Sequence, residues 1–321
     1  MFKKCVVLIC LVLFASCSFV QSGSRETKEK KLKVLSTTQI VDDVVSRVGK
    51  ERISHQSLIT GDIDPHSYEL VKGDDEKLHD ADLIFSNGLG LEHGASLQYQ
   101  LKHHAANVSM GDYLLEIYPT SILYVDGQVD PHVWMDVALW SETVDLVVEK
   151  LSEKDPEGKI AYLENGAKAK LEMEELDKKM RSLLSTVPPE KRYLVTSHDA
   201  FNYFAKRYLS DPTDDPDQQR FMAPEGLAPD GQLSTSDIKK VADYLLQFEI
   251  QTIFPESNVS RDALKKIVKV CQEKGLTVSL SKDVLYGDVL GPKGSDAETY
   301  LQMIEHNVAV LVKTWGGDNG K

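Results

Sequence analysis

The sequence predicts an α/β protein with parallel sheets flanked by helices. Strand-like and helix-like patterns alternate in both halves of the chain, which is typical of βαβ units and of parallel sheets. The length of 321 residues exceeds what one small core needs. A helical pattern of roughly 30 residues separates the two alternating halves. We therefore expect two compact lobes, with a long helix between them in the chain.

Residues 1–22 have the composition of a signal peptide and the start of a mature tail. Two lysines precede an apolar run from Cys5 to Ala15, and small residues follow it. This run is shorter than the about 20 residues that span a bilayer. Cys17 ends "FASC", which resembles a bacterial lipobox, so we expect a lipid on Cys17; simple cleavage near Ser22 is the alternative. We therefore expect an exported protein that is periplasmic or otherwise extracytoplasmic.

The composition excludes several classes of protein. With 41% apolar and 27% charged residues, neither wholesale disorder nor multiple membrane spans is expected. A formal net charge of −13 argues against a broad nucleic-acid-binding face, which has to be basic. Cys5 and Cys10 leave with the signal, and lipidation of Cys17 leaves Cys271 without a disulfide partner. We expect Cys271 to be a small buried hydrophobe.

The N-terminal lobe is expected over residues 23–154. Its first elements, in order, are a strand in "LKVLSTT" (32–38), a helix in "QIVDDVVSRVG" (39–49), a strand in "RISHQSLI" (52–59), a helix in "KGDDEKLHDA" (72–81) and a strand in "DLIFSN" (82–87). This order predicts a parallel sheet, because parallel neighbours need a crossover between them.

A single long helix is expected over residues 155–187. Asp155 and Pro156 form a good N-cap and first-turn pair, and Pro188 and Pro189 stop the helix. Apolar side chains recur at helical steps at Ile160, Leu163, Ala167, Met173, Leu176, Met180, Leu183 and Val187. Two interpretations stay open, a long surface helix and a rigid strut that joins the lobes.

The C-terminal lobe is expected over residues 188–321. Its elements are a strand in "RYLVTS" (192–197), a helix in "DAFNYFAKRYL" (199–209), an irregular acidic loop (211–232), a helix in "TSDIKKVADYLLQF" (235–248), a strand in "QTIFPE" (251–256), a helix in "SRDALKKIVKVCQEKG" (260–275), a strand in "TVSLS" (277–281) and a helix near 297–315. The second half therefore repeats the α/β alternation of the first.

Four candidate metal ligands follow predicted strands. His66 and His132 come from the first lobe, and His198 and Asp288 come from the second. Ligands of open parallel sheets bind outside the carboxyl ends of the strands, where loops converge. Three imidazoles and one carboxylate form a chemically suitable shell for Mn²⁺, Zn²⁺ or Fe²⁺.

Two of these histidines share the tripeptide Asp-Pro-His, in "IDPHSYE" and "VDPHVWMD". Proline restricts both its own φ and its predecessor, so the histidine that follows leaves the backbone in a restricted direction. Asp64 and Asp130 either orient a ligand ring or only shape the turn. The other histidines are interpreted as structural or surface residues: His55, His79, His93, His103, His104 and His306.

The order of several motifs resembles one protein family. A lipobox-like start is followed by "DPHSYE", "NGLGLE", "DPHVWMD", "LSEKDP" before a long helix, "LVTSHDAFNYFAKRY", "IFPES" and "YGDVL". In this order they resemble the metal-binding receptors, or solute-binding proteins, of bacterial ABC metal importers of the TroA, ZnuA and PsaA type. The resemblance covers nearly all of the mature chain. It implies two lobes joined by one rigid helix, with the ligand site in the interlobe cleft.

The resemblance also assigns the site and the partners. It implies metal ligation by His66, His132, His198 and Asp288, with Asp283 as a neighbouring carboxylate and Glu256 as a family feature that is not a ligand. It implies a non-enzymatic monomer that binds Mn²⁺, Zn²⁺ or Fe²⁺ as transported ligand and delivers it to an ABC permease. The absence of a histidine-rich loop favours manganese or iron, although intrinsic affinity at a nitrogen-rich site favours zinc.

Two other classes of function are alternatives to this one. An exported zinc-dependent metallohydrolase could use the same histidines, but a catalytic zinc keeps an open position that Asp288 would close. The sequence has no "HExxH", and the adjacent Ser197, His198 and Asp199 are not a triad, whose members meet in space. An adhesin or structural lipoprotein would bind no metal tightly.

Overall fold

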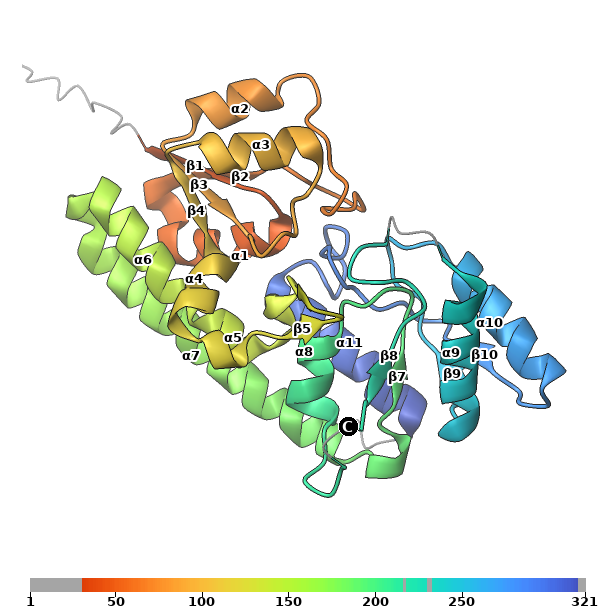
Figure 1. Cartoon of the computed structure of the whole chain (residues 1–321). Helices are drawn as coiled ribbons and strands as arrows, with labels where there is room; N and C mark the ends of the chain where they lie inside the picture. The colour runs from red at the N-terminus through yellow and green to blue at the C-terminus, as the bar shows by residue number, and fades with distance from the viewer. Residues whose placement is uncertain (1–30, 216–217, 230–232, 317–321) are drawn as a thin grey trace, which may run out of the picture. The chain divides into compact units, whose positions relative to one another are not determined.

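The computed structural model describes residues 31–215, 218–229 and 233–316, which belong to one compact unit (Figure 1). The predictions of a signal peptide and of a lipid on Cys17 lie outside the described residues. In the described part of the chain, no helix is long and apolar enough to cross a membrane. The lobe boundaries at 154 and 187 remain predictions.

The first half is built on a four-stranded parallel sheet. Its strands are β1 (Leu32–Ser36), β2 (Ile53–Ser57), β3 (Leu83–Ser86) and β4 (Asn107–Ser109), in the order β2-β1-β3-β4. Adjacent residues of β1 face opposite sides, as a strand requires. Val34 belongs to the apolar cluster that includes helix α1 (Gln39–Gly49), whereas Leu35 packs with helices α2 (Asp74–Asp80) and α3 (Ala95–His103).

Helix α1 has the bounds that the sequence predicts. The hydroxyl of Thr38 accepts a hydrogen bond from the backbone N–H of Val41, so the first turn is capped. The helix then buries its valine-rich face against the sheet. Several elements of the first half were not predicted from the sequence. They are β4, α4 (Met110–Ile117), the hairpin of β5 (Tyr124–Val125) and β6 (Gln128–Val129), α5 (Val137–Ser141) and α6 (Thr143–Lys154).

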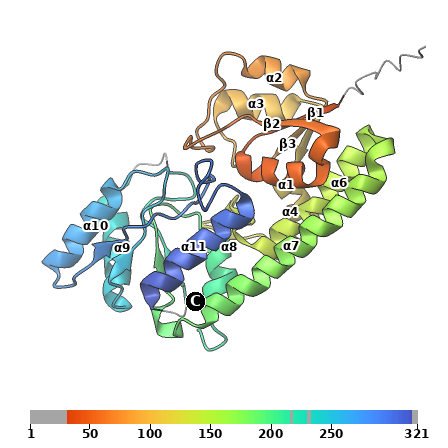
Figure 2. The ribbon, with the colours of Figure 1, turned by 180° about the vertical axis from the view of Figure 1, so that it is seen from behind.

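The long helix is α7 (Lys159–Ser185), and it contacts elements of both halves. It packs against α1, α5 and α6 from the first half and against α11 (Tyr300–Trp315) from the second (Figures 1 and 2). Asp155 does not cap α7 directly, because a 3-10 turn over Pro156–Gly158 intervenes. The carboxylate of Asp155 accepts a hydrogen bond from the N–H of Gly158.

The apolar repeat of α7 does not coincide with its buried face in the first turns. Ile160 is 72% exposed and Leu163 is 50% exposed, whereas Tyr162 and Gly166 are buried. The reason is close packing against α6: a Cβ on Gly166 would lie 2.5 Å from Cγ2 of Val148. A glycine at the contact lets the two helices approach, and the face of α7 that carries Ile160 and Leu163 lies away from this contact.

The second half contains two short parallel strand pairs. Strand β7 (Leu194–Val195) pairs with β8 (Phe221–Met222), and β9 (Thr252–Ile253) pairs with β10 (Ser279–Leu280). A hydrogen bond from the N–H of Phe254 to the carbonyl of Val195 connects the two pairs. The helices are α8 (Asn202–Phe204), α9 (Thr235–Gln247), α10 (Asp262–Glu273) and α11. The prediction that Cys271 is buried is confirmed.

Two further predictions for this half are wrong in part. The helix expected from 199 begins only at Asn202 and continues as a π-helical turn over Ala205–Leu209. Asp199 belongs to the loop of His198, where its N–H donates to the carbonyl of Gly226, a long-range contact that local periodicity does not predict. The segment expected to be an irregular loop contains β8. Just before β8, the carbonyl of Arg220 accepts a hydrogen bond from the N–H of Leu194 in β7. This contact is long-range, so the local sequence pattern does not predict the strand.

Candidate metal centre

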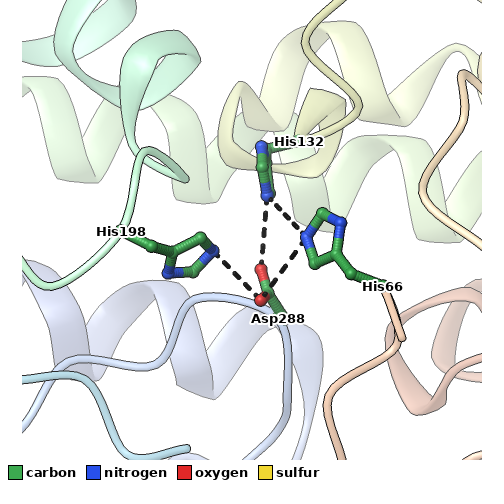
Figure 3. A group of neighbouring side chains, drawn as sticks. All are labelled: His66, His132, His198 and Asp288. Carbon is green, nitrogen blue, oxygen red and sulfur yellow. Dashed lines mark hydrogen bonds and ion pairs between the residues drawn. The ribbon is translucent and has the colours of Figure 1, made fainter. Parts of the chain in front are cut away.

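Four side chains from loops far apart in the sequence converge on one point (Figure 3). His66 follows β2, His132 follows the β5–β6 hairpin, His198 follows β7 and Asp288 follows β10. One ligand atom from each lies within 4.8 Å of all the others. These are the four residues that the sequence analysis singled out. Asp283, by contrast, pairs with Lys313 at the surface.

The distances within this cluster are short. Nε2 of His66 lies 3.3 Å from Nε2 of His132 and 3.8 Å from Oδ2 of Asp288. The other oxygen of Asp288 lies 3.5 Å from Nε2 of His132. Oδ2 of Asp288 also lies 3.1 Å from Nε2 of His198. All four residues are buried, so water does not solvate their polar atoms.

The first Asp-Pro-His segment is held through its backbone. The carboxylate of Asp64 accepts hydrogen bonds from the N–H of His66, at 2.9 Å, and from the hydroxyl of Ser67, at 2.7 Å. The carbonyl of His66 accepts hydrogen bonds from the N–H groups of His93 and Gly94. Asp64 therefore shapes the turn, and the loop after β3 fixes the position of His66.

The second Asp-Pro-His segment is held through its ring as well. Oδ1 of Asp130 lies 2.7 Å from Nδ1 of His132 and accepts a hydrogen bond from its backbone N–H at 2.9 Å. The amide of Asn202 donates to the other oxygen of Asp130. A proton on Nδ1 of His132 leaves the lone pair of Nε2 for a metal ion. The two copies of the tripeptide thus use their aspartates differently.

Glu256 orients the third histidine, a role that the sequence analysis did not predict. Its Oε2 lies 2.7 Å from Nδ1 of His198, and its Oε1 accepts hydrogen bonds from the N–H groups of Ser197 and His198, both at 2.9 Å. Glu256 follows β9 and is buried. Its position at the end of a predicted strand is the only sequence signal for this role. The carboxylate therefore fixes both the ring and the backbone of His198.

The donor set fits a cation. The oxygens of Asp288 and Nε2 of His198 are buried, and their polar neighbours at short distance are the other atoms of the cluster. Buried polar atoms without partners are costly, and a buried carboxylate needs a compensating positive charge. Gly287 has no Cβ, and one added there would lie 2.5 Å from Oε2 of Glu256. The loop that carries Asp288 therefore depends on glycine to approach the site closely.

The charges in the site are coupled. Burial and the neighbouring histidines lower the pKa of His66 well below its ordinary value, although Asp288 acts in the opposite direction. Burial would also lower the pKa of His198, but Asp288 and Glu256 raise it well above the ordinary value. Burial opposes the ionisation of Asp288, but the charge on His198 lowers the pKa of Asp288. Asp288 and Glu256 thus favour the protonated form of His198.

An α/β fold with three imidazoles and a carboxylate in a buried cluster is typical of the metal-binding receptors of ABC importers. The family described as ZnuA, zinc-uptake complex component A, periplasmic, matches residues 34–314. The chain belongs to this family. Its members are solute-binding proteins of ABC metal transporters, so the chain is a metal-binding receptor of this kind and not an enzyme.

Individual relatives match along nearly their whole length. Metal-binding protein YtgA of Chlamydia trachomatis serovar D is 37% identical over 97% of this chain and 94% of its own. The manganese-binding lipoprotein MntA of Bacillus subtilis is 30% identical over 95% of this chain and 98% of its own. The zinc-binding protein TroA of Treponema pallidum is 27% identical over 97% of both chains.

Solved structures agree with this assignment. The crystal structure of Fe(III)-bound YtgA from Chlamydia trachomatis superposes with a TM-score of 0.85 at 36% identity, covering 91% of this chain and 100% of that one. The periplasmic zinc-binding protein TroA from Treponema pallidum has a TM-score of 0.80 at 28% identity, covering 89% and 99%. The predicted α/β fold, with parallel sheets and a long helix, is confirmed.

Proposed function

We propose that His66, His132, His198 and Asp288 bind one divalent transition metal ion, which this chain carries to the permease of an ABC importer. The observation that supports the ligand set is the convergence of four buried ligand atoms within 4.8 Å. The two carboxylates that flank His198 favour its protonated form in the metal-free protein. A metal ion would replace a proton on Nε2 and supply the positive charge that Asp288 faces.

We further propose manganese or iron as the transported ion. Both oxygens of Asp288 face imidazole nitrogens, so the carboxylate can bind through both at once. The three histidine nitrogens and the two oxygens of Asp288 would then give five ligand atoms, whereas a typical zinc site has four. The printed names of the relatives support a choice within this group, since they include manganese-binding MntA, zinc-binding TroA and Fe(III)-bound YtgA.

The chain is proposed to act outside the cytoplasmic membrane as a monomer. The signal-like residues 1–22 and the lipobox-like Cys17 support export and a lipid anchor. The names of the relatives agree, since MntA and ScbA are lipoproteins and the family is described as periplasmic. Mass spectrometry of the protein from its native membrane tests this: an acyl mass on a chain that starts at Cys17 is expected.

Calorimetric titration of metal-stripped protein tests the ligand set. We expect one ion per chain for Mn²⁺, Zn²⁺ and, without oxygen, Fe²⁺. His198→Ala should weaken binding by at least about a hundredfold, since a lost ligand costs more than the 10–100-fold of a lost ring partner. His79→Ala, which removes an exposed histidine, is the matched control. Unchanged affinity in His198→Ala would remove this residue from the shell.

The transported ion requires a separate measurement, because affinity and use in the cell differ. A nitrogen-rich site binds Zn²⁺ more tightly than Mn²⁺ whatever its biological cargo. Elemental analysis of protein purified from its native compartment without added metal should find manganese or iron in excess of zinc. A preparation that carries zinc alone contradicts the proposed cargo but leaves the ligand set intact.

A further inference from the structure

Asp288 lies within the long loop that connects β10 to α11, residues 281–299. Its carboxylate points toward the three imidazoles (Figure 3). A loop of this length has many accessible conformations unless contacts restrict it, and ordering it costs conformational entropy. The contacts that hold the loop in place therefore decide how well Asp288 is prepared for an ion.

Side chains from outside the loop fix the two residues directly before Asp288. Asn307 of α11 is fully buried, and its side chain bonds to both backbone groups of Tyr286. Its amide group donates to the carbonyl of Tyr286 at 2.8 Å, and its oxygen accepts from the N–H of Tyr286 at 2.9 Å. The ring N–H of Trp134 donates to the carbonyl of Gly287 at 3.0 Å. One arm of the loop is thus anchored through its backbone.

The neighbouring residue of α11, His306, contacts both arms of the loop. Its Nε2 lies 3.0 Å from the carbonyl oxygen of Val284, which precedes Asp288. Its Nδ1 lies 3.0 Å from Oδ2 of Asp296, which follows Asp288. The ring of Tyr286 also faces that of His306, with 5.2 Å between the ring centres. The imidazole of His306 therefore joins the segment before Asp288 to the segment after it.

Both hydrogen-bond partners of the His306 ring are acceptors. A backbone carbonyl and an ionised carboxylate cannot donate, so each ring nitrogen has to carry the proton of its own hydrogen bond. The hydrogen bond from His306 lowers the pKa of Asp296, whose side chain is 80% exposed, so this carboxylate is ionised near neutral pH. Asp283 of the same loop also acts on the ring, but it pairs with Lys313 of α11 at 2.8 Å. The complete contact thus requires the imidazolium form.

We propose that His306 is a positioning residue for Asp288, because its protonated ring joins the two arms of the loop that carries this carboxylate; this rests on the proposed function of the cluster. His306 lies outside the cluster and acts by restricting the loop. Without the ring, the loop stays anchored at Tyr286 but gains freedom on the side that leads to α11. Asp288 then has to be ordered when the ion binds, and part of the binding free energy is lost.

Metal affinity and metal release test this role in the full metal-free protein. His306→Leu fills the space of the ring without an N–H group. Calorimetric titration with Mn²⁺ should show about tenfold weaker binding, the low end of what a lost partner of a ligand costs. Transfer of bound Zn²⁺ to an excess of chelator should be faster by about the same factor.

The partner of the ring provides a second variant. Asp296→Ala removes the acceptor on the exposed side of the contact and leaves the packing of α11 intact. It should weaken Mn²⁺ binding by about threefold, and it should add nothing to His306→Leu in the double variant, as coupled residues do. Additive effects of the two substitutions would overturn the proposal, because His306 and Asp296 would then act separately.

The pH dependence separates positioning by a protonated ring from packing alone. Histidine side chains change charge between about pH 5 and 8. The ratio of the affinities of the unsubstituted protein and His306→Leu at one pH removes the contribution of the cluster, which both proteins share. This ratio should be largest near about pH 6 and shrink toward about pH 8, as the ring loses its second proton. A constant ratio overturns the proposal, since a ring that only packs does not need that proton.

Lys313→Gln is the matched control, because it breaks another pair between α11 and the same loop. The side chains of Lys313 and Asp283 are 67% and 44% exposed, so affinity and release should stay within about twofold. Unchanged affinity and release in His306→Leu overturn the proposal even if the variant melts at a lower temperature, because His306 would then serve folding alone. That result leaves the proposed function intact. Failure of the unsubstituted protein to bind any ion would refute the proposed function and this inference with it.

Discussion

Asp288 and His198 face each other across 3.1 Å, from Oδ2 of the carboxylate to Nε2 of the ring. The opposite nitrogen of the same ring lies 2.7 Å from Glu256. The imidazole is thus held between two buried carboxylates, which is why the pKa of His198 is raised although burial acts against it. A metal ion bound at Nε2 has to displace the proton that these carboxylates stabilise.

Metal binding is therefore expected to release a proton from His198 and to weaken as the pH falls. The pKa of His198 is raised well above its ordinary value, which favours a protonated ring in the metal-free protein, whereas a metal ion on Nε2 requires the neutral ring. Each pH unit below that pKa should then lower the affinity about tenfold. The pKa of His66 is lowered, so His66 contributes no proton in this range.

Titration calorimetry in buffers of different ionisation enthalpy counts the protons released. Glu256→Gln is the informative variant, because loss of one carboxylate should lower the pKa of His198 and reduce the number of protons released at pH 7. A binding enthalpy that is the same in all buffers would contradict this prediction.

The two Asp-Pro-His segments should respond differently to the same substitution. Asp130 contacts the ring of His132 as well as its backbone N–H, whereas Asp64 contacts only the backbone N–H of His66 and the hydroxyl of Ser67. Asp130→Asn should weaken metal binding by about 10–100-fold, as expected for a lost ring partner. Asp64→Asn should change it by less than about threefold. Equal effects would show that both aspartates act only through the turn.

The ion pair between Asp177 and Arg207 should stabilise the packing of α7 on the second half. Arg207 donates to both carboxylate oxygens, and the hydroxyl of Tyr208 donates to one of them. Asp177→Asn should lower the free energy of unfolding by about 2–3 kcal/mol, less than for a fully buried pair because the Arg207 side chain is 25% exposed. Asp243→Asn, which breaks the exposed pair with Lys274, is the control and should have little effect.

The pH dependence of this effect follows from the pKa of Asp177. Burial opposes ionisation, but the hydrogen bonds from Arg207 and Tyr208 lower the pKa of Asp177. A lowered pKa in the folded state adds stability that is complete above the unfolded value of about 3.9 and disappears as the pH falls through the folded value. Urea unfolding should therefore show a difference between Asp177→Asn and the unsubstituted protein that is constant from pH 5 to 7 and shrinks below about pH 4.

Gly166 should tolerate substitution far less well than its neighbour Ala167. A Cβ on Gly166 would lie 2.5 Å from Cγ2 of Val148, a stiff branched side chain, so α6 and α7 would have to separate. Gly166→Val should lower the free energy of unfolding by about 1–3 kcal/mol. Ala167→Val, on the exposed face, should cost about 0.5 kcal/mol through helix propensity alone. Urea denaturation of both variants distinguishes packing from propensity.

Local patterns predicted several elements closely. Helix α1 begins after Thr38, which caps it, and the apolar period continues through Gly49, so every local preference agrees. The sequence pattern does not identify the buried face of α7, because Ile160 and Leu163 fit a helical period as well as Tyr162 and Gly166 do. Only the distance to α6 decides between the two faces, and periodicity within one helix carries no information about that distance.

The sequence alone determined the α/β alternation, the long helix, the family and the four residues proposed as ligands, because these depend on local periodicity and on the order of motifs. Tertiary structure alone decided that Asp130 contacts the ring of His132 and Glu256 that of His198, that Asp64 contacts no ring of the cluster, and that His93 lies beside His66. The physical reason is that a donor and an acceptor form a hydrogen bond only when the folded chain brings them close together in space. Loops distant in the chain become neighbours only when the strands that carry them are folded.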